Sequence, residues 1–347
     1  MLDRSDKDKP LLATPRDLRF RPLRDLRFSI LDRCNFRCTY CMPEDSLADK
    51  GVFLPRRDWL SDNDIEHIVR AFCSLGTNRL RLTGGEPLLR PGLVELVQRL
   101  SAIPAIEDLS MTTNAVHLPR LADSLFNAGL NRITVSLDSL DDAVFAEMTG
   151  ERGTVAQVQA GISAAESAGF KSLKINCVVK RGTNDHTIMD MVEHFRGSGH
   201  ILRLIEYLDV GNSNDWHDGL VVPGQSWQKT IHDRWPLRPL KPGKPGETAQ
   251  RYAFEDGQGE IGLINSITQP FCGHCSRARV AADGMLYTCL FASKGVPLKP
   301  LLKEGNDHVA MADFISDIWL NRNDRYSEIR HLDSTPQPAQ EMYRMGG

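Results

Sequence analysis

Three cysteines, Cys34, Cys38 and Cys41, lie within eight residues of one another, directly after a strand-like run. A closed structural zinc site normally takes four protein ligands, and no fourth Cys or His lies nearby. Three cysteines suit a cubane iron–sulfur cluster, which then keeps one iron free to bind a small molecule and pass it an electron. An incomplete zinc site, or a cluster with a distant fourth ligand, remains an alternative at this point.

A second group of three cysteines lies near the other end of the chain. Cys272 and Cys275 enclose Gly273 and His274, and thirteen residues separate Cys275 from Cys289. This pattern again offers three thiolates and an open position. A zinc knuckle is the alternative, with His274 as a fourth ligand, although the middle residues of such knuckles usually point away from the metal.

Basic residues accompany both groups of cysteines. Arg277 and Arg279 are alternate residues just past Cys275, so on an extended strand both guanidiniums share one face beside the metal. That arrangement suits the binding of phosphate or carboxylate. Further cations lie in or beside strand-like runs, and their convergence would match a polyphosphate; they are Arg27, Arg81, Lys174 and Arg203.

The two remaining cysteines of the eight, Cys73 and Cys177, stand alone within apolar segments. We interpret both as small buried hydrophobic residues. The grouping into two triplets and two single residues differs from the disulfide framework of a secreted protein and indicates metal binding.

The elements that carry these residues alternate between strand and helix patterns. Strands are expected at residues 26–31, 79–83, 109–112, 132–137, 173–179 and 201–208. Helices are expected near 61–75, 92–102, 118–129, 141–169 and 184–198, the first opened by a capping pattern at Ser61. This order predicts an α/β protein with a partial (β/α)6 TIM-type barrel.

Active sites of such barrels gather where the strands end. Cys34, the Gly84-Gly85-Glu86-Pro87 run, Thr113-Asn114 and Asp138 all follow expected strands. We expect an N-terminal arm at 1–20 that is partly disordered, and a barrel at 21–235. An irregular Pro/Gly-rich connection at 236–249 would lead to a C-terminal cluster region at 250–347.

Composition limits the function classes. The 347 residues are 41% hydrophobic and 25% charged, with a formal net charge of −3. No apolar run approaches the ~20 residues of a membrane span, and the charge provides no general attraction to nucleic acid. We expect a cytoplasmic protein that binds neither membranes nor nucleic acid.

The C-x-x-x-C-x-x-C spacing of the first triplet, followed by Gly84-Gly85-Glu86-Pro87 after the next strand, resembles the radical S-adenosylmethionine superfamily. The resemblance implies that these cysteines hold a 4Fe-4S cluster that cleaves S-adenosylmethionine. It also implies that Tyr40 lies against the adenine and that the Gly-Gly-Glu-Pro loop meets the methionyl amine. Paired glycines let a backbone approach a ligand closely, and proline restricts the exit.

The order of both triplets, the intervening strands and the final Gly346-Gly347 resemble the GTP 3′,8-cyclase family of molybdenum cofactor biosynthesis, from about residue 23 to the end. The distinguishing strings are Leu26-Arg27-Phe28-Ser29-Ile30, Asp32-Arg33-Cys34-Asn35-Phe36-Arg37-Cys38, Arg81-Leu82-Thr83-Gly84-Gly85-Glu86-Pro87-Leu88, Thr112-Thr113-Asn114, Val135-Ser136-Leu137-Asp138-Ser139-Leu140, Lys174-Ile175-Asn176 and the segment 271–291.

This family resemblance implies roles for individual residues. Contacts to S-adenosylmethionine would come from Tyr40, Gly84, Gly85, Glu86, Ser136 and Leu208. Contacts to GTP would come from Arg27, Arg81, Thr112, Lys174, Arg277, Ala278 and Arg279, and the open iron of the second cluster would receive the guanine ring. Arg27, Arg277, Arg279, Gly346 and Gly347 are the implied catalytic residues.

Three positions depart from the family pattern. Arg79 stands where lysine is usual, Ala115 where glycine is common, and Leu208 where methionine is usual. The first departure keeps the charge, and the third leaves a backbone contact intact, so neither disqualifies the assignment.

The implied reaction begins with one electron from reduced flavodoxin or an equivalent donor. S-adenosylmethionine is cleaved, the deoxyadenosyl radical abstracts the ribose 3′ hydrogen of GTP, and the carbon radical adds to guanine C8. The product, (8S)-3′,8-cyclo-7,8-dihydroguanosine 5′-triphosphate, would pass to cyclic pyranopterin monophosphate synthase, and a homodimer is possible.

Two alternatives compete with this interpretation. One is another radical enzyme with an auxiliary cluster, such as a peptide-modifying enzyme, although those typically carry more C-terminal cysteines. The other is a non-catalytic iron–sulfur electron-transfer protein. Two three-cysteine sites argue against it, because an electron carrier benefits from fully ligated clusters.

Overall fold

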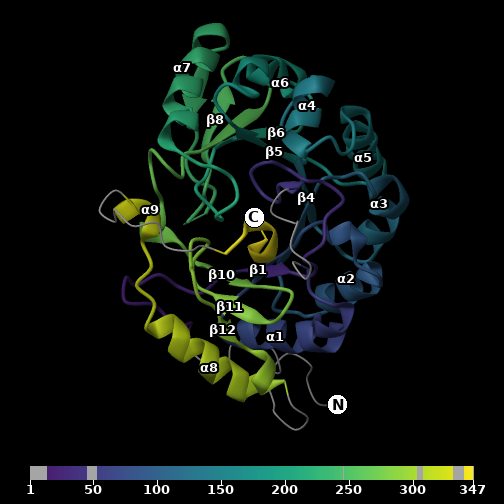
Figure 1. The fold of residues 1–347 in the computed structure, drawn as a ribbon, viewed down its shortest axis with the longest axis vertical. Coiled ribbons are helices and arrows are strands. Elements are labelled where there is room, and N and C mark those ends of the chain that lie inside the picture. The colour runs from purple at the N-terminus through teal and green to yellow at the C-terminus, as the bar shows by residue number, and fades with distance from the viewer. Residues whose placement is uncertain (1–13, 45–52, 245, 303–307, 331–339, 347) are drawn as a thin grey trace.

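The computed structural model describes residues 14–44, 53–244, 246–302, 308–330 and 340–346. These residues form one twelve-stranded sheet in the order β12-β11-β10-β1-β2-β3-β4-β5-β6-β9-β8-β7. Every neighbouring pair from β10 to β9 is parallel, and the two outer pairs at each edge are antiparallel. The sheet curves into an open barrel with helices outside it (Figure 1).

The six strands expected from the sequence are confirmed and follow one another in the sheet. They are β1 (Asp25–Ser29), β2 (Arg79–Thr83), β3 (Asp108–Thr113), β4 (Arg132–Ser136), β5 (Lys174–Val179) and β6 (Ile201–Glu206). The C-terminal part adds β7 (Leu237–Pro239), β8 (Gln250–Phe254), β9 (Glu260–Ile264), β10 (Arg277–Val280), β11 (Met285–Tyr287) and β12 (Val296–Pro297).

Helices connect consecutive parallel strands and cover the outer face. They are α1 (Asp62–Ser74), α2 (Leu93–Ser101), α3 (Leu118–Asn127), α4 (Asp142–Thr149), α5 (Val155–Ser167) and α6 (Ile188–Phe195). The C-terminal part holds α7 (Gly224–Arg234), α8 (His308–Leu320), α9 (Tyr326–Ile329) and α10 (Met342–Met345). Ser61 caps α1 through the capping box expected from the sequence.

The single helix expected at 141–169 is wrong, because the structure has two helices there. Gly150 ends α4 in the left-handed conformation at φ 65°, and Thr154 starts α5 with a capping box. A Cβ at Gly150 would lie 2.4 Å from the carbonyl oxygen of Arg37. The break therefore lets this corner pack against the first cysteine loop.

The C-terminal part extends the barrel sheet at both edges. β10 pairs with β1, and β9 pairs with β6, both in parallel. The stretch 236–249 was expected to be irregular throughout, but it begins with β7, which pairs antiparallel with β8. Pro239 is tolerated there because β7 is the edge strand and needs fewer donors.

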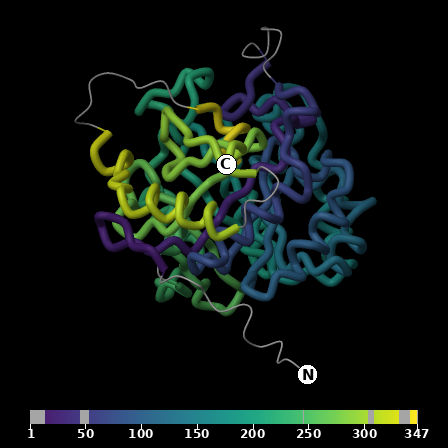
Figure 2. The backbone as a smooth tube through the Cα atoms, turned by 90° about the horizontal axis from the view of Figure 1, so that it is seen from below, coloured from purple at the N-terminus to yellow at the C-terminus, as the bar shows by residue number. Residues whose placement is uncertain are grey.

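The described part of the expected N-terminal arm, residues 14–20, is docked on the protein through Asp17 and Leu18, while the side chains of Leu18 and Phe20 stay exposed. Asp17 is buried, and the amide of Leu18 donates to the carbonyl of Arg322, just past α8. Figure 2 shows the purple N-terminal segment lying beside the yellow helix α8. Residues 1–13 lie outside the described residues.

The main hydrophobic core lies between the outer face of the sheet and the helices, and Cys73 and Cys177 belong to it as expected. Side chains of alternate strand residues point the other way, into the barrel. Within the described chain, no helix has the length and apolar character needed to cross a bilayer.

Candidate active site

The first triplet lies in the loop that leaves β1. The amides of Cys41 and Met42 both donate to the carbonyl of Cys38 at 2.9 Å, and the amide of Phe36 donates to the Cys34 sulfur at 3.4 Å. Burial, followed by the charge of Glu86, raises the pKa of Cys34 to about 12, and burial also raises the pKa of Cys38 and Cys41. Three buried thiols of this kind need a cationic partner before they ionise.

Gly84 and Gly85 follow β2 and pack directly on the cysteine loop. A Cβ at Gly84 would lie 2.2 Å from the Leu31 carbonyl oxygen, and one at Gly85 would lie 2.2 Å from the Arg33 carbonyl oxygen. The sequence analysis assigned the glycines to ligand approach. The structure gives them an additional reason, because any side chain here would displace the loop that carries Cys34.

Glu86 holds the loop from the other side. Its carboxylate accepts hydrogen bonds from the Thr113 hydroxyl at 2.7 Å, the Asn114 amide at 2.8 Å and the Leu88 amide at 3.0 Å. Burial raises the pKa of Glu86 to about 7. Both carboxylate oxygens of Glu86 accept hydrogen bonds from the protein, so this side chain holds the loop in position.

Tyr40 is fixed by Asp138 at the end of β4. The Tyr40 hydroxyl donates to Asp138 at 2.8 Å, and the second Asp138 oxygen accepts from the Val178 amide at 2.8 Å. Burial raises the pKa of Asp138 to about 6. The Tyr40 ring thus has a fixed position in the wall of the cavity.

A cavity of about 230 Å³ lies inside the barrel, between the strands and the loops that follow their carboxyl ends. It brings together residues predicted for the first cluster, for S-adenosylmethionine and for GTP; its walls include Cys34, Cys38, Tyr40, Cys41, Gly84, Gly85, Glu86, Ser136, Leu208, Arg27, Arg81, Thr112, Arg277 and Arg279. The first triplet lies in the loop after β1, and the arginines Arg27, Arg81 and Arg279 lie within the strands; we call this basic side of the cavity its floor.

The second triplet surrounds a neighbouring cavity of about 70 Å³, which Cys272, Cys275 and Cys289 all line. Burial on its own raises the pKa of Cys275, but the charges of Arg277 and Arg322 outweigh burial and lower it to about 6. Burial raises the pKa of Cys289 to about 11. Leu208, Arg277 and Arg279 also line the larger cavity, so the two cavities adjoin.

Three arginines form a row across the barrel floor. The sheet register pairs Arg27 of β1 with Arg279 of β10 on one side and with Arg81 of β2 on the other. Burial, and then repulsion by Arg279 and Arg81, lowers the pKa of Arg27. Burial likewise lowers the pKa of Arg81 and of Arg279 to about 10.

Cations one layer below this row have carboxylate partners. Arg79 and Lys244 approach Asp25 at 3.6 and 3.8 Å, and Arg132 pairs with Asp108. By contrast, a different set makes no ion pair with any described residue; its members are Arg27, Arg81, Lys174, Arg203, Arg277 and Arg279. Arg203 and Arg279 of this set are buried, and buried charges are normally paired, so the set is suited to bind an anion.

Arg203 of β6 lines the 230 Å³ cavity, whereas Lys174 of β5 lines an adjoining cavity together with Arg27, Arg81 and Arg203. Burial, and then the charge of Arg203, lowers the pKa of Lys174 to about 7. Burial lowers the pKa of Arg203 to about 10. Thr112 accepts a hydrogen bond from Arg81 at 3.4 Å.

The end of the chain enters this site. Arg279 donates from one nitrogen to the carbonyls of Gly346 at 2.5 Å and Met345 at 3.2 Å. Gly346 has φ 65°, and a Cβ there would lie 1.8 Å from the Thr83 hydroxyl oxygen. In Figure 1 the yellow terminal helix lies in the middle of the ring of strands. Gly347 lies outside the described residues.

Two predicted site residues face elsewhere. Ala278 lies on the opposite face of β10 from Arg277 and Arg279, and its side chain packs in the main core. Only its backbone can reach the cavity. His274, considered as a fourth metal ligand, is exposed.

Sequence reasoning missed a group behind the second triplet. Asp17, Arg21 and Arg322 are buried there; Arg21 and Arg322 contact the backbone of Cys272 and Cys275, and Asp17 links the two arginines. Composition was the one available signal, because Arg21 is one of several arginines at the start of the chain.

The donor sets of both triplets suit iron–sulfur clusters. Each triplet offers three soft thiolates at one cavity. Among the described residues, no three Cys, His, Asp or Glu side chains converge closely enough to hold a single metal ion. A four-iron cluster spans several ångströms and takes ligands that are further apart.

Two family signatures divide the chain. The Radical SAM superfamily matches residues 28–195, and Molybdenum Cofactor Synthesis C matches residues 200–328. These ranges contain the first and the second triplet, respectively.

Two solved structures with this fold are distant in sequence. SuiB from Streptococcus suis, bound to S-adenosylmethionine, superposes with a TM-score of 0.57 at 13% identity, over 93% of this chain and 77% of that chain. The anSMEcpe structure with bound AdoMet has a TM-score of 0.54 at 17% identity, over 82% of this chain and 81% of that chain. Both are similar in fold.

Curated relatives are much closer. The GTP 3′,8-cyclase of Xanthomonas campestris pv. campestris (strain 8004) is 53% identical over 97% of this chain and 99% of its own length. That of Acidothermus cellulolyticus is 47% identical over 92% and 89%, and that of Staphylococcus epidermidis (strain ATCC 35984) is 39% identical over 90% and 92%. The chain therefore belongs to the GTP 3′,8-cyclase family, whose N-terminal part is a radical S-adenosylmethionine domain.

Proposed function

We propose that this chain cyclises GTP to (8S)-3′,8-cyclo-7,8-dihydroguanosine 5′-triphosphate in molybdenum cofactor biosynthesis, with S-adenosylmethionine as radical source and two 4Fe-4S clusters. The observation that carries the proposal is the unpaired row of Arg279, Arg27 and Arg81 at the floor of a cavity that also holds three thiols. A triphosphate supplies the missing negative charge. Family membership supports the same reaction.

The first cluster, when bound, would supply the electron that cleaves S-adenosylmethionine and so generates the hydrogen-abstracting radical. The residues of the chain position the ligands. Tyr40, held by Asp138, presents its ring to the adenine, and the backbone of Gly85 faces the methionyl group. Ser136 and Leu208 complete this wall.

GTP would lie below, with its triphosphate on the basic floor. Arg27 and Arg81 bind phosphate oxygens directly, and Lys174 adds a cation that is partly neutral until an anion arrives. Arg277 and Arg279 connect the floor to the second triplet. Thr112 supplies a hydroxyl, and Ala278 only its backbone.

The second triplet would hold the auxiliary cluster next to the purine. The pKa of Cys275 is lowered, so this cysteine forms a thiolate more readily than the cysteines of the first triplet, whose pKa values are raised. Gly346, bound by Arg279, lies against Thr83 of the cavity wall, where there is no space for a side chain, and we propose that it helps to keep water out. Exclusion of water protects a radical intermediate from side reactions.

The other proposed partners rest on the family resemblance. They are reduced flavodoxin or an equivalent donor, and cyclic pyranopterin monophosphate synthase as the next enzyme. A homodimer and a cytoplasmic location are proposed on the same basis.

The test is product analysis of the anaerobically reconstituted, reduced chain with S-adenosylmethionine, with and without GTP. We expect roughly eight irons per chain, four from each triplet. Cys38→Ser should halve the iron and abolish deoxyadenosine formation. Cys275→Ser should halve the iron and abolish the cyclised nucleotide. Zinc in the second site, or no GTP-derived product, would refute the proposal.

A further inference from the structure

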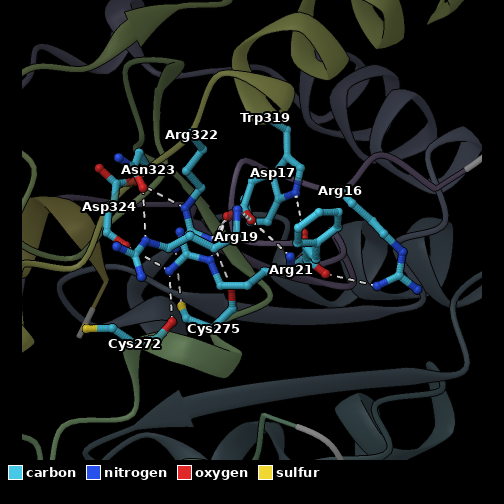
Figure 3. Close-up of polar contacts among 11 residues, drawn as sticks. Arg16, Asp17, Arg19, Arg21, Cys272, Cys275, Trp319, Arg322, Asn323 and Asp324 are labelled. Carbon is cyan, nitrogen blue, oxygen red and sulfur yellow. Dashed lines mark hydrogen bonds and ion pairs between the residues drawn. The ribbon is translucent and has the colours of Figure 1, made fainter.

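A buried ion cluster lies directly behind the second triplet, and we call Arg21, Asp17 and Arg322 the Arg–Asp–Arg bridge. Asp17 and Arg21 come from the N-terminal arm, and Arg322 comes from the loop after α8. Their exposed fractions are 4%, 2% and 4%. Figure 3 shows the three side chains converging beside Cys272 and Cys275.

The Asp17 carboxylate joins the two guanidiniums. One oxygen accepts from Arg21 at 2.6 Å and from Arg322 at 3.1 Å. The other oxygen accepts from the amides of Arg19 and Arg21, both at 2.9 Å. One carboxylate therefore fixes the turn of the arm and bridges both guanidiniums.

Both cations contact the metal-binding loop. Arg322 donates to the carbonyl of Cys275 at 2.8 Å and to its sulfur at 3.4 Å. Arg21 donates to the carbonyl of Cys272 at 2.8 Å. Two of the three cysteines are thus held in position by arginines from two distant segments of the chain.

One donor of the bridge is left over. Arg21 Nη2 is buried and has no hydrogen-bond partner among the described residues. Arg21 and Arg322 line the same cavity as Cys272, Cys275 and Cys289. A buried donor without a partner is rare in native structures, and the sulfur of a cluster in this cavity is a suitable acceptor.

Further residues hold Arg322 in place beside the cavity. Asp324, which also lines the cavity, accepts from Arg322 at 3.1 Å, so Asp17 and Asp324 together balance the charges of Arg21 and Arg322. Trp319 covers the Arg322 guanidinium at 4.4 Å and donates to the Arg21 carbonyl at 3.0 Å. The donors of the bridge are therefore held in fixed positions next to the cysteine loop.

We propose that the Arg–Asp–Arg bridge positions Cys272 and Cys275 and raises the reduction potential of the auxiliary cluster. The proposal rests on the two-cluster function proposed above. Hydrogen bonds to cluster sulfurs and nearby positive charge stabilise the reduced cluster, which is the more negative form. Arg322 is accordingly a positioning and tuning residue, because it acts on the cluster through its sulfur ligand.

The test is a redox titration of the reconstituted full chain followed by electron paramagnetic resonance, with the first cluster as internal reference. Arg322→Gln should reduce the ratio of reduced to oxidised auxiliary cluster about tenfold at fixed potential, equivalent to about 59 mV for one electron. Asp17→Asn should shift it in the opposite direction, because the two buried cations lose the counter-charge that they share. The first cluster should keep its potential in both variants.

Arg19→Gln is the matched control. Arg19 belongs to the same turn but donates to Asn323 and touches no cysteine, so its removal should leave both potentials unchanged. An unchanged auxiliary potential in Arg322→Gln, with full iron content, would overturn the proposal. If Arg322→Gln loses the cluster, Asp17→Asn decides: an unchanged auxiliary potential in that variant, with full iron content, means a structural role alone.

Failure of the two-cluster function has a separate signature. Wild-type chain that holds about four irons after reconstitution lacks the auxiliary cluster altogether, and the proposal then falls with it. Eight irons with an unresponsive potential refute only the role of the bridge.

Discussion

Replacement of Gly346 by alanine tests whether the end of the chain is part of the site. The new Cβ would lie 1.8 Å from the Thr83 hydroxyl oxygen and 2.8 Å from its Cβ. The Thr83 hydroxyl donates to the Phe28 carbonyl at 3.3 Å and is buried, so it has little room to move. The tail must therefore leave its place.

The magnitude follows from what the undocked tail loses. Charge-assisted hydrogen bonds such as those from Arg279 to the Gly346 carbonyl contribute about 1.5–3 kcal/mol. Alanine in the left-handed conformation at φ 65° costs a further ~1–2 kcal/mol. The sum of about 2.5–5 kcal/mol lowers the docked population by roughly two to four decades.

The assay compares cyclised nucleotide with deoxyadenosine by mass spectrometry, alongside iron content and melting temperature. We expect Gly346→Ala to lose nearly all cyclised product while iron content and melting temperature stay as in wild type. Gly257→Ala is the matched control, because Gly257 has φ 80° with open space around it and pays only the backbone cost. Thr83→Ala in the Gly346→Ala background should restore part of the product, since only the 2.8 Å contact remains.

Wild-type cyclisation by Gly346→Ala would refute this reasoning, and so would a loss of iron, because the tail touches neither triplet directly in the described contacts. A C-terminal tag should likewise reduce the cyclised product, because the family resemblance implies that the last two glycines take part in the site.

Three further predictions follow from the same geometry. Gly161→Ala should destabilise the fold by about 1–3 kcal/mol in urea titrations, because the new Cβ would lie 2.2 Å from the Ala115 carbonyl oxygen. Its control is Ala115→Gly, which relieves a φ of 66° and should leave the free energy of unfolding unchanged or higher. GTP affinity, measured by calorimetry, should fall as pH rises above about 7, because burial lowers the pKa of Lys174 to about 7 and a bound phosphate raises it again. Binding therefore takes up a proton. Lys174→Arg should remove this pH dependence. Gly150→Ala should reduce first-cluster iron and spare the second cluster, because its Cβ would displace Arg37 in the cysteine loop.

The barrel was predictable because its signals are local. Each of the six strands is a short run of β-forming residues followed by an amphipathic helix, and right-handed crossovers then fix their order. The helix at 141–169 was mispredicted because residues on both sides of Gly150 have helical patterning. The break lets Gly150 and Gly153 pack against Arg37 and Phe36, which are distant in sequence.

The three departures from the family pattern acquire physical explanations. Arg79 pairs with Asp25, so its charge is used one layer below the proposed phosphate site. Ala115 occupies a left-handed conformation that glycine adopts more easily. Leu208 lines both cavities, and its carbonyl accepts from Asn214.

The second triplet shows what spacing alone leaves open. Cys272, Cys275 and Cys289 could be recognised as metal ligands from their intervals, but not the buried arginines behind them. Arg21 and Arg322 are about 300 positions apart, and each resembles a surface residue within its own segment. Their pairing through Asp17 depends on the docking of the arm against α8, for which neither segment carries a pattern.

The basic floor depends on a register that the sequence does not specify. Arg27 and Arg81 were recognisable as inward-facing residues of neighbouring strands, whereas β10 joins β1 from a distant part of the chain. Because strand side chains alternate between faces, a slip of β10 by one residue would turn Ala278 into the lumen and both of its arginines into the apolar core. Burying two arginines in that core would be costly, so the apolar outer face enforces the register. The hydrophobic core thereby fixes the position of the charges that we propose to bind GTP.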